Sequence, residues 1–216
     1  MAAPRKPVRT IYDYVYLSDL VPGWTRGDEA RALAEASHSL PDNAVIVEVG
    51  AFMGSGTILL AGPRKMRGSG TVHAIDPFDG SGDALSVPIY REIVAAHDRP
   101  IREVYEAVIR RAKVQQWVVT HQARGEDVAA SWATPIDMLF LDGDHSPKGA
   151  RSAFEAWYPW LKPGGIIAVH NSSDGEYEPD HDGSRRLVVT EIVPPRFTDI
   201  ELVTTTTFAR KAALRQ

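Results

Sequence analysis

The chain has 216 residues and a formal net charge of −4. Its length suits one α/β domain, and its slightly acidic balance argues against a protein that binds nucleic acid by neutralising phosphates. The absence of cysteine excludes disulfide bonds, thiolate zinc sites and a cysteine nucleophile. No signal peptide or membrane span is recognisable, so we expect a cytoplasmic protein that binds no membrane.

Short β-branched runs alternate with longer amphipathic segments along the chain, a pattern typical of a parallel sheet with helices on both faces. The first helix is predicted at Thr25–His38, within residues 20–40, with Thr25 and Asp28 as a capping box. A short helix ending near Pro63 follows the first strand. The parallel strands are predicted at Ala44–Val49, Thr71–Asp76, Trp117–His121, Ile136–Asp142 and Ile166–His170.

Residues 77–100 are rich in glycine and polar residues and predict a long loop with one helix at most, which could serve as a lid over a site. Ile101–Ile109 follows the helical period. The remaining predicted elements are a helix at Glu126–Trp132, one capped by Ser146 and ended by Lys162–Gly165, one at Leu187–Ile192, and a hairpin of Ile200–Thr204 and Thr207–Lys211. The prediction is one domain over residues 1–216, a doubly wound Rossmann-like sheet of seven strands, mostly parallel with an antiparallel C-terminal hairpin.

Ligands of such sheets bind beyond the carboxyl ends of the strands, where this sequence is unusually polar. The first strand ends in a glycine-rich turn from Gly50 to Gly56, and the second ends in Asp76, which could accept hydrogen bonds from both hydroxyls of a ribose. The two features together favour nucleoside binding over a merely structural turn and cap. Phe52 stands where the dinucleotide fingerprint requires glycine, which argues against a dinucleotide.

The segments Val45–Thr57 and Val72–Phe78 resemble class I S-adenosylmethionine-dependent methyltransferases. Ile136–Ser146 and Leu161–His170 are similar to the later motifs of the small-molecule O-methyltransferase group that includes the macrocin and aminocoumarin-sugar methyltransferases and the cephamycin-biosynthesis partner. The resemblance spans about residues 20 to 210. As a whole the chain also resembles the mycobacterial sugar O-methyltransferases of methylmannose polysaccharide synthesis.

This resemblance implies how S-adenosylmethionine would be bound. Glu48 would orient the first loop and the amino acid end of the donor, and Asp76 would hold the ribose. The methionine moiety would be wrapped by Gly50, Phe52, Gly54 and Ser55. Ala123 and Arg124 would flank the adenine, although Gly125 replaces the small polar residue that is usual there.

Polar residues also follow the fourth and fifth strands, where the acceptor would lie. An alcohol needs a base or a metal ion to acquire alkoxide character. His145 is the first candidate base because neutral imidazole titrates near physiological pH, and Asp144 is the second or orients His145. The resemblance implies a divalent ion, with Mg²⁺ as the first candidate, at Asp142, His170 and Asn171. His170-Asn171 replaces the acidic pair of the related group, and imidazole suits Mg²⁺ less than oxygen does.

The acceptor is expected to be a small molecule. Trp24, Tyr90, Trp132 and Tyr177 could offer flat faces to a sugar or an aromatic ring. The acidic loop after the fifth strand disfavours an anionic acceptor, so a neutral sugar or a sugar-containing metabolite fits best. Two alternatives stay open, a dinucleotide-dependent oxidoreductase and a non-catalytic methyltransferase-like partner. The sequence also leaves the oligomeric state open, a homodimer included.

Overall fold

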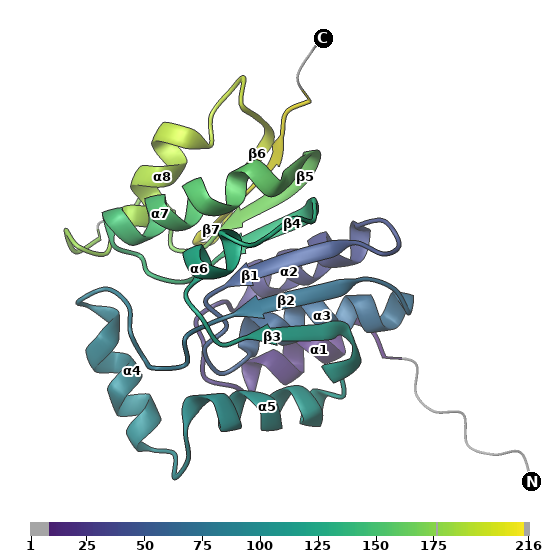
Figure 1. Ribbon diagram of the computed structural model, residues 1–216, viewed down its shortest axis with the longest axis vertical. Coiled ribbons are helices and arrows are strands. Elements are labelled where there is room, and N and C mark those ends of the chain that lie inside the picture. Colours follow the sequence, from purple (N-terminus) through teal and green to yellow (C-terminus); the bar gives the residue numbers. More distant parts are fainter. Residues whose placement is uncertain (1–8, 176, 214–216) are drawn as a thin grey trace, which may run out of the picture.

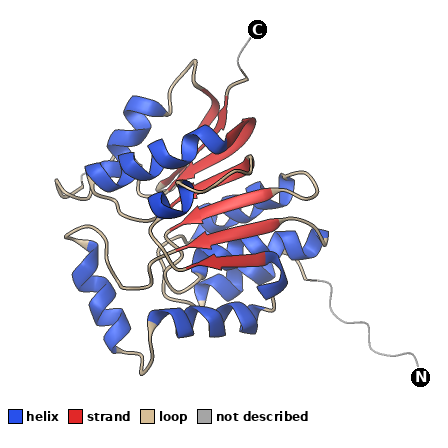
Figure 2. Ribbon diagram, in the orientation of Figure 1, coloured by secondary structure: helices blue, strands red, loops and turns tan. Residues whose placement is uncertain are grey.

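The structure is a computed structural model that describes residues 9–175 and 177–213. Seven strands form one sheet in the order β3-β2-β1-β4-β5-β7-β6 (Figures 1 and 2). Strands β1 to β5 pair in parallel, and β7 runs antiparallel to both β5 and β6. The predicted Rossmann-like sheet, mostly parallel with an antiparallel C-terminal hairpin, is confirmed. The strands are Val45–Val49 (β1), Thr71–Ile75 (β2), Val118–His121 (β3), Ile136–Leu141 (β4), Leu161–Val169 (β5), Phe197–Val203 (β6) and Thr206–Lys211 (β7).

Helices cover both faces of this sheet. Helices α1, α2 and α3 lie on one face and α6, α7 and α8 on the other, while α5 borders β3 (Figure 1). Their bounds are Ile11–Asp19 (α1), Gly27–Ser39 (α2), Ser55–Arg67 (α3), Ser86–Ala95 (α4), Ile101–Ala112 (α5), Gly125–Ala129 (α6), Pro147–Trp157 (α7) and Gly183–Glu191 (α8). None of the described helices is both long and apolar enough to cross a membrane.

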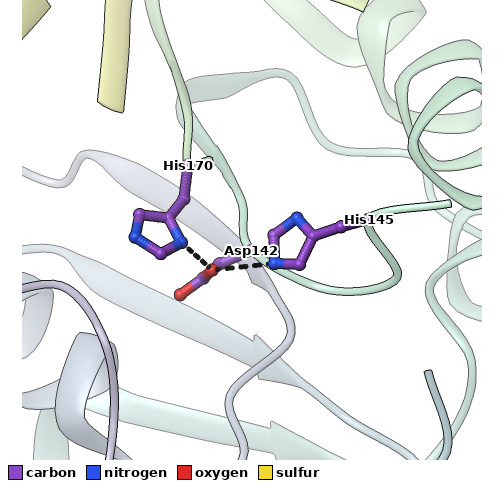
Figure 3. Close-up of side chains that lie close together, drawn as sticks. All are labelled: Asp142, His145 and His170. Carbon is purple, nitrogen blue, oxygen red and sulfur yellow. Dashed lines mark ion pairs between the residues drawn. The ribbon is translucent and has the colours of Figure 1, made fainter. Parts of the chain in front are cut away.

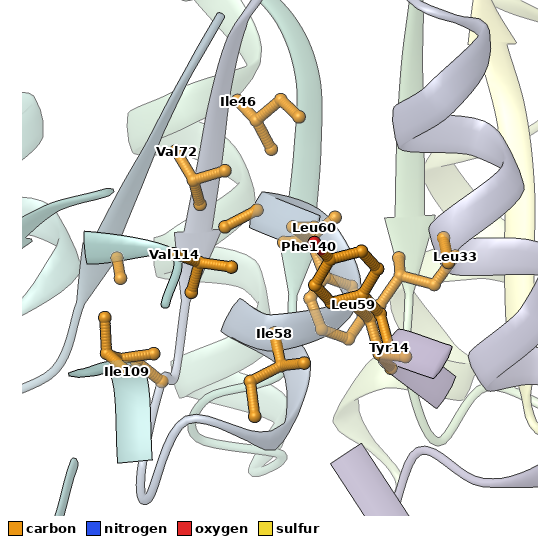
Figure 4. Close-up of a cluster of buried hydrophobic side chains, with 14 of the residues drawn as sticks. Tyr14, Leu33, Ile46, Ile58, Leu59, Leu60, Val72, Ile109, Val114 and Phe140 are labelled. Atoms are coloured by element: carbon orange, nitrogen blue, oxygen red, sulfur yellow. The ribbon is translucent and has the colours of Figure 1, made fainter. Parts of the chain in front are cut away.

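The core is divided by the sheet into two hydrophobic clusters, because successive residues of a strand point to opposite faces. Ile46 of β1 packs in the cluster that holds Leu33 and Leu59 (Figure 4). Its neighbour Val47 packs in the other, with Trp157 of α7. The largely buried β1 and the fully buried β4 therefore form a rigid centre, whose carboxyl ends carry the first glycine loop and Asp142.

The N-terminal helices differ from the prediction. Helix α1 was not predicted, because Tyr12 and Tyr16 are exposed and only Tyr14 among its large side chains is buried, so the sequence shows no apolar stripe. The predicted capping box of Thr25 and Asp28 is wrong. Helix α2 begins at Gly27, and the Glu29 carboxylate accepts a hydrogen bond of 3.3 Å from the backbone N–H of Arg26.

Helix α3 does not end near Pro63, as predicted, but continues to Arg67. A proline inside a helix removes one backbone hydrogen bond, and burial outweighs that loss here. The buried Arg64 side chain donates to the carbonyls of Pro41 and His38, and the Tyr14 ring packs against Gly62.

Strand β5 also differs, because it begins at Leu161 rather than at Ile166. Leu161 pairs with Ile136, the register then shifts, and Ile166 pairs with Met138. The predicted helix breakers Lys162–Gly165 therefore form a bulge inside the strand.

The segment 77–100 contains helix α4, which stands apart from the sheet, beyond the ends toward which the parallel strands point (Figure 1). The helix is anchored at its start by Asp83, whose carboxylate accepts hydrogen bonds from the backbone N–H and the hydroxyl of Ser86. The same carboxylate lies 3.0 Å from Nδ1 of His181. Asp83 therefore joins this segment to the loop after β5.

Candidate functional site

A cavity of about 390 Å³ opens at the carboxyl ends of β1, β2, β4 and β5. Its walls include the first glycine loop, the 77–100 segment, the start of α6 and the loops after β4 and β5. This volume lies within the usual range for small-molecule sites, about 300–1,000 Å³. The predicted residues that line it are Gly50, Phe52, Ser55, Asp76, Arg124, Asp142, Asp144, His145, His170 and Asn171.

The first loop brings the backbones of β1 and β4 unusually close together. Gly50 has a φ of 97°, and a Cβ there would lie 2.1 Å from the carbonyl oxygen of Asp142. Only glycine combines this positive φ with this approach. Gly54, with a φ of 94°, precedes the first residue of α3, so the loop ends at a helix N-terminus.

Asp76 closes this loop from the end of β2. One carboxylate oxygen accepts a hydrogen bond of 2.8 Å from the Phe52 N–H, and the other accepts one of 2.6 Å from the Phe78 N–H. Burial raises the pKa of the Asp76 carboxyl, although these hydrogen bonds favour its charged form. Each oxygen keeps a further lone pair, so Asp76 can accept ligand hydroxyls while it shapes the loop.

Glu48 lies beneath the loop and is fully buried. One of its carboxyl oxygens accepts a hydrogen bond from the Thr57 hydroxyl, and a Cβ on Gly56 would lie 2.4 Å from the other. Glu48 is not among the residues that line the cavity, so its visible role is to fix the first turn of α3. Burial, opposed by the Thr57 hydrogen bond, raises the pKa of Glu48 to about 8.

A raised pKa predicts a pH dependence of stability. The Glu48 carboxyl has an ordinary pKa of 4.5 in the unfolded chain and a pKa of about 8 in the folded protein. Its contribution to the free energy of unfolding is therefore fully present below pH 4.5 and is lost as the pH rises toward 8. Between pH 5 and 8, the free energy of unfolding of the native protein should fall relative to Glu48→Gln by more than about 1.4 kcal/mol, the value of one pKa unit. Urea unfolding across this range measures the difference. The exposed Glu155→Gln is the control, and parallel curves for native protein and Glu48→Gln would contradict the shift.

Three other residues were predicted to bind the methyl donor, and their side chains or positions do not face the cavity openly. Ser55 lines the cavity, but its hydroxyl lies 2.8 Å from that of Ser18 and faces α1. Gly54 and Ala123 are not among the lining residues, whereas Arg124 and Gly125 at the start of α6 are. The structure therefore brings Arg124 to the predicted site and leaves Ala123 outside it.

Beyond the ends of β4 and β5, the side chains of Asp142, His145 and His170 converge (Figure 3). One Asp142 oxygen, Oδ1, lies 2.7 Å from Nδ1 of His170 and 3.7 Å from Nε2 of His145. The sequence predicted that these side chains would meet, since each follows the end of β4 or β5. Both imidazoles are buried, with exposures of 4% for His145 and 2% for His170.

The two histidines differ in protonation. Burial lowers the pKa of His145 to about 4, so this imidazole is neutral near pH 7, and its Nδ1 lies 3.0 Å from the Ser184 hydroxyl. Burial alone would also lower the pKa of His170, but the carboxylates of Asp142 and Glu29 outweigh it and raise the value to about 10. This second value describes the site without a metal ion, because a bound cation would oppose a positive charge on His170.

The structure adds neighbours that the sequence did not indicate. Glu29 of α2 lies 3.8 Å from Nε2 of His170 and accepts hydrogen bonds from the hydroxyls of Thr205 and Thr206. His181, held by Asp83, lines the cavity, and its ring centroid lies 5.0 Å from that of His145. No local motif connects these groups, because they meet only through the fold.

Two polar residues predicted to act beside Asp142 and His145 form contacts with other residues instead. The Asn171 amide nitrogen lies 3.4 Å from Nε2 of His181. Asp144 accepts a hydrogen bond of 2.8 Å from the Ser146 N–H, next to the start of α7, and among the described residues its side chain forms no hydrogen bond or ion pair with His145. The suggestion that Asp144 orients His145 is therefore not supported, since Ser184 is the hydrogen-bonding neighbour of that imidazole.

Aromatic residues form one flank of the cavity. Trp24, Phe52 and Tyr90 pack together with ring centroids 5.0 to 5.8 Å apart, and Trp24 remains 43% exposed. Trp132, another predicted aromatic face, packs instead against Trp157 and His73 and is not among the lining residues.

Comparisons with known proteins identify related domains. A family model described as a methyltransferase domain matches residues 47–172. The cofactor-bound protein Rv0187 from MTB has a TM-score of 0.65 at 16% identity, covering 93% of this chain and 88% of its own. The O-methyltransferase from Bacillus cereus in complex with SAH has a TM-score of 0.61 at 15% identity, covering 93% of this chain and 90% of its own. CalS11, a TDP-rhamnose 3′-O-methyltransferase of calicheamicin biosynthesis, has a TM-score of 0.55 at 18% identity, covering 84% of this chain and 76% of its own. At these identities the structural likeness establishes the fold.

Proposed function

The chain belongs to the S-adenosylmethionine-dependent methyltransferase family whose domain model matches residues 47–172, and we propose that it methylates a hydroxyl oxygen of a sugar or a sugar-containing metabolite. One observation carries the proposal. The donor loop with Asp76 and the polar group of Asp142, His145 and His170 line the same cavity. Methyl transfer is an in-line displacement, so both partners must be aligned in one site.

The donor end is assigned from the loop contacts. We propose that the Asp76 carboxylate accepts the ribose hydroxyls while it holds the Phe52 N–H, and that Gly50, Phe52 and Ser55 surround the methionine moiety. Arg124 lies where it can flank the adenine, and Glu48 supports the loop from beneath. The bulky Phe52 lines the cavity and disfavours the pyrophosphate of a dinucleotide, which counts against an oxidoreductase.

Asp76→Ala should weaken binding of S-adenosylmethionine by roughly 10- to 150-fold, because a charged hydrogen bond is worth about 1.5–3 kcal/mol. Calorimetry measures the donor affinity, and circular dichroism checks the fold, since the variant also loses the bond to the Phe52 N–H. Asp79→Ala, an exposed neighbour, is the matched control. Unchanged donor affinity in folded Asp76→Ala would remove the ribose assignment.

Three observations support a sugar acceptor. Aspartate and histidine side chains at one end of the cavity offer hydrogen bonds to a polyhydroxylated ring, while Trp24 and Tyr90 offer flat faces. Several carboxylates in the loop after β5 disfavour an anionic acceptor. CalS11, which shares the fold, is described as a methyltransferase of TDP-rhamnose, which supports a sugar as the methylated group but not the anionic diphosphate that the acidic loop disfavours. A mannoside of polysaccharide synthesis is one acceptor of this class.

The acceptor hydroxyl must lose its proton during transfer. We propose that Asp142 and His170, together with Asn171 or another neighbour, hold a divalent ion, and that His145 or Asp144 receives the proton. A divalent ion bound to a hydroxyl lowers its pKa. His170 Nδ1 suits such a site, since it is buried and has no in-line hydrogen-bond partner among the described residues. The resemblance implies Mg²⁺, which prefers oxygen ligands, yet one of the two shared ligands is an imidazole.

The 77–100 segment is proposed to act as a lid. Gly80, Gly82 and Leu85 line the cavity, and Asp83 ties the segment to His181. Amides of residues 77–100 should exchange more slowly with solvent deuterium when donor and acceptor are both bound, while those of β6, which has no residue in the cavity wall, should not change. Hydrogen exchange followed by mass spectrometry tests this, and equal exchange with and without ligands would contradict a lid.

The proposed function is tested by supplying methyl-labelled S-adenosylmethionine with a panel of neutral sugars, glycosides and sugar nucleotides. Label on a sugar oxygen is the expected result. Donor binding with no transfer to any hydroxylated acceptor would support the non-catalytic partner instead. A thermal shift with NAD(P) but not with S-adenosylmethionine would favour the oxidoreductase.

A further inference from the structure

The group of Asp142, His145 and His170 has the composition of a transition-metal site. The carboxylate oxygen and the two ring nitrogens all lie within 4.8 Å of one another. Ligands of one ion at bond lengths of about 2.0–2.2 Å lie roughly 3–3.5 Å apart, and the two distances to Asp142 Oδ1, 2.7 and 3.7 Å, bracket that range. Small movements of these side chains, of which the two histidines are buried, would bring all three atoms around one ion.

The orientation of His170 supports this interpretation. Its Nδ1 lies 2.7 Å from Asp142 Oδ1, yet among the described residues this buried nitrogen has no hydrogen-bond partner of acceptable geometry. A nitrogen and an oxygen that are close but not aligned with each other are arranged like two adjacent ligands of a third atom.

The far side of each imidazole is held as metal-bound histidines usually are. Nδ1 of His145 lies 3.0 Å from the Ser184 hydroxyl, which leaves Nε2 directed at Asp142. Nε2 of His170 faces Glu29 at 3.8 Å, and that carboxylate is itself anchored by Thr205 and Thr206. The structure therefore provides both the ligands and the groups that orient them.

We propose that Asp142, His145 and His170 bind one divalent transition-metal ion of the Zn²⁺ or Co²⁺ type, and that His145 rather than Asn171 completes the set. Two imidazoles and one carboxylate suit such ions, whereas Mg²⁺ favours oxygen ligands. The Asn171 amide is directed to His181 instead. Within the proposed function, this assignment makes His145 a metal ligand and leaves Asp144 as the proton acceptor.

The test is metal binding by the full chain without donor or acceptor. Co²⁺ should bind one to one and give visible absorption bands of a four- or five-coordinate ion with nitrogen ligands. Zn²⁺ should displace it, while Mg²⁺ in large excess should not. His145→Gln should weaken Zn²⁺ binding by 10-fold or more, and Asn171→Ala, the matched variant at the alternative ligand, should leave it unchanged.

Ser184→Ala provides a second variant if His145→Gln does not fold. It removes only the hydroxyl beside Nδ1 and should cost about 10- to 100-fold in Zn²⁺ affinity. Mg²⁺ binding as tight as Zn²⁺ binding, or loss of affinity in Asn171→Ala but not in His145→Gln, would overturn the assignment. Methyl transfer is measured separately, so a chain that binds Co²⁺ as described but methylates no sugar would refute the proposed acceptor and leave the metal site standing.

Discussion

Asp142→Ala is expected to abolish methyl transfer while binding of S-adenosylmethionine survives. Within the described part of the chain, one oxygen of the Asp142 carboxylate lies 2.7 Å from a ring nitrogen of His170 and 3.7 Å from one of His145, so in the proposed mechanism its loss should remove the ion that activates the acceptor hydroxyl. The loss in turnover should reach at least roughly 100-fold, since Lewis-acid stabilisation is worth several kcal/mol and each 1.36 kcal/mol is about tenfold in rate. The proposed donor contacts follow β1, β2 and β3, so calorimetry should show nearly unchanged donor affinity.

Removal of the metal by a chelator should reproduce this phenotype in the native protein, and added Zn²⁺ or Co²⁺ should restore turnover. Asp174→Ala, an exposed carboxylate in the loop after β5, is the matched control. Full activity in excess chelator at saturating donor would show that no metal takes part. Asp142 would then serve only the ion pair with His170, and its replacement would lower stability more than turnover.

His145→Gln and Asp144→Asn, measured side by side, should each reduce turnover by roughly 10²- to 10⁴-fold, but for different reasons. His145→Gln should lose metal affinity together with activity. Asp144→Asn should keep donor and metal affinity and lose only the proton acceptor, because asparagine can still accept the hydrogen bond from the Ser146 N–H. Turnover is measured at a metal concentration that just saturates the native protein, and metal affinity by Co²⁺ titration.

The reverse pattern is equally informative. If His145→Gln retained its metal and lost turnover, while Asp144→Asn remained active, His145 would be the base, and the transition-metal assignment would lose its third ligand. Unchanged turnover in both variants would place the proton acceptor elsewhere, and His181 with its partner Asp83 is the remaining imidazole of the cavity.

The sequence predicted the parts of the site that lie directly at strand ends. Gly50, Asp76 and Asp142 each follow a short buried strand, and parallel strands bring such positions to one edge of the sheet. The sheet itself was predictable because β1 and β4 are short, buried and bounded by turn residues.

Contacts between distant elements could not be predicted in the same way. Glu29 belongs to α2, where it looks like an ordinary helix-start acid, and only packing brings it beside His170 and Thr205. Ser184 and His145 are 39 residues apart. Helix α1 was missed because exposed tyrosines hide its pattern, and the bulge in β5 because proline and glycine normally end a strand.

The close approach of Gly50 to the Asp142 carbonyl has a consequence for redesign of this enzyme. The end of β1, where we propose that the donor binds, and the end of β4, where we propose that the acceptor binds, approach each other there through backbone atoms, since a Cβ at position 50 would lie 2.1 Å from the Asp142 carbonyl oxygen. In the proposed function, the spacing between sulfonium and hydroxyl would depend on this main-chain contact, and a misplacement of about 1 Å can cost 10²-fold in rate. On this proposal, substitutions at Trp24, Leu85 or Ile89 in the cavity wall should change which acceptors are accepted, whereas any side chain at position 50 should lower turnover with every acceptor.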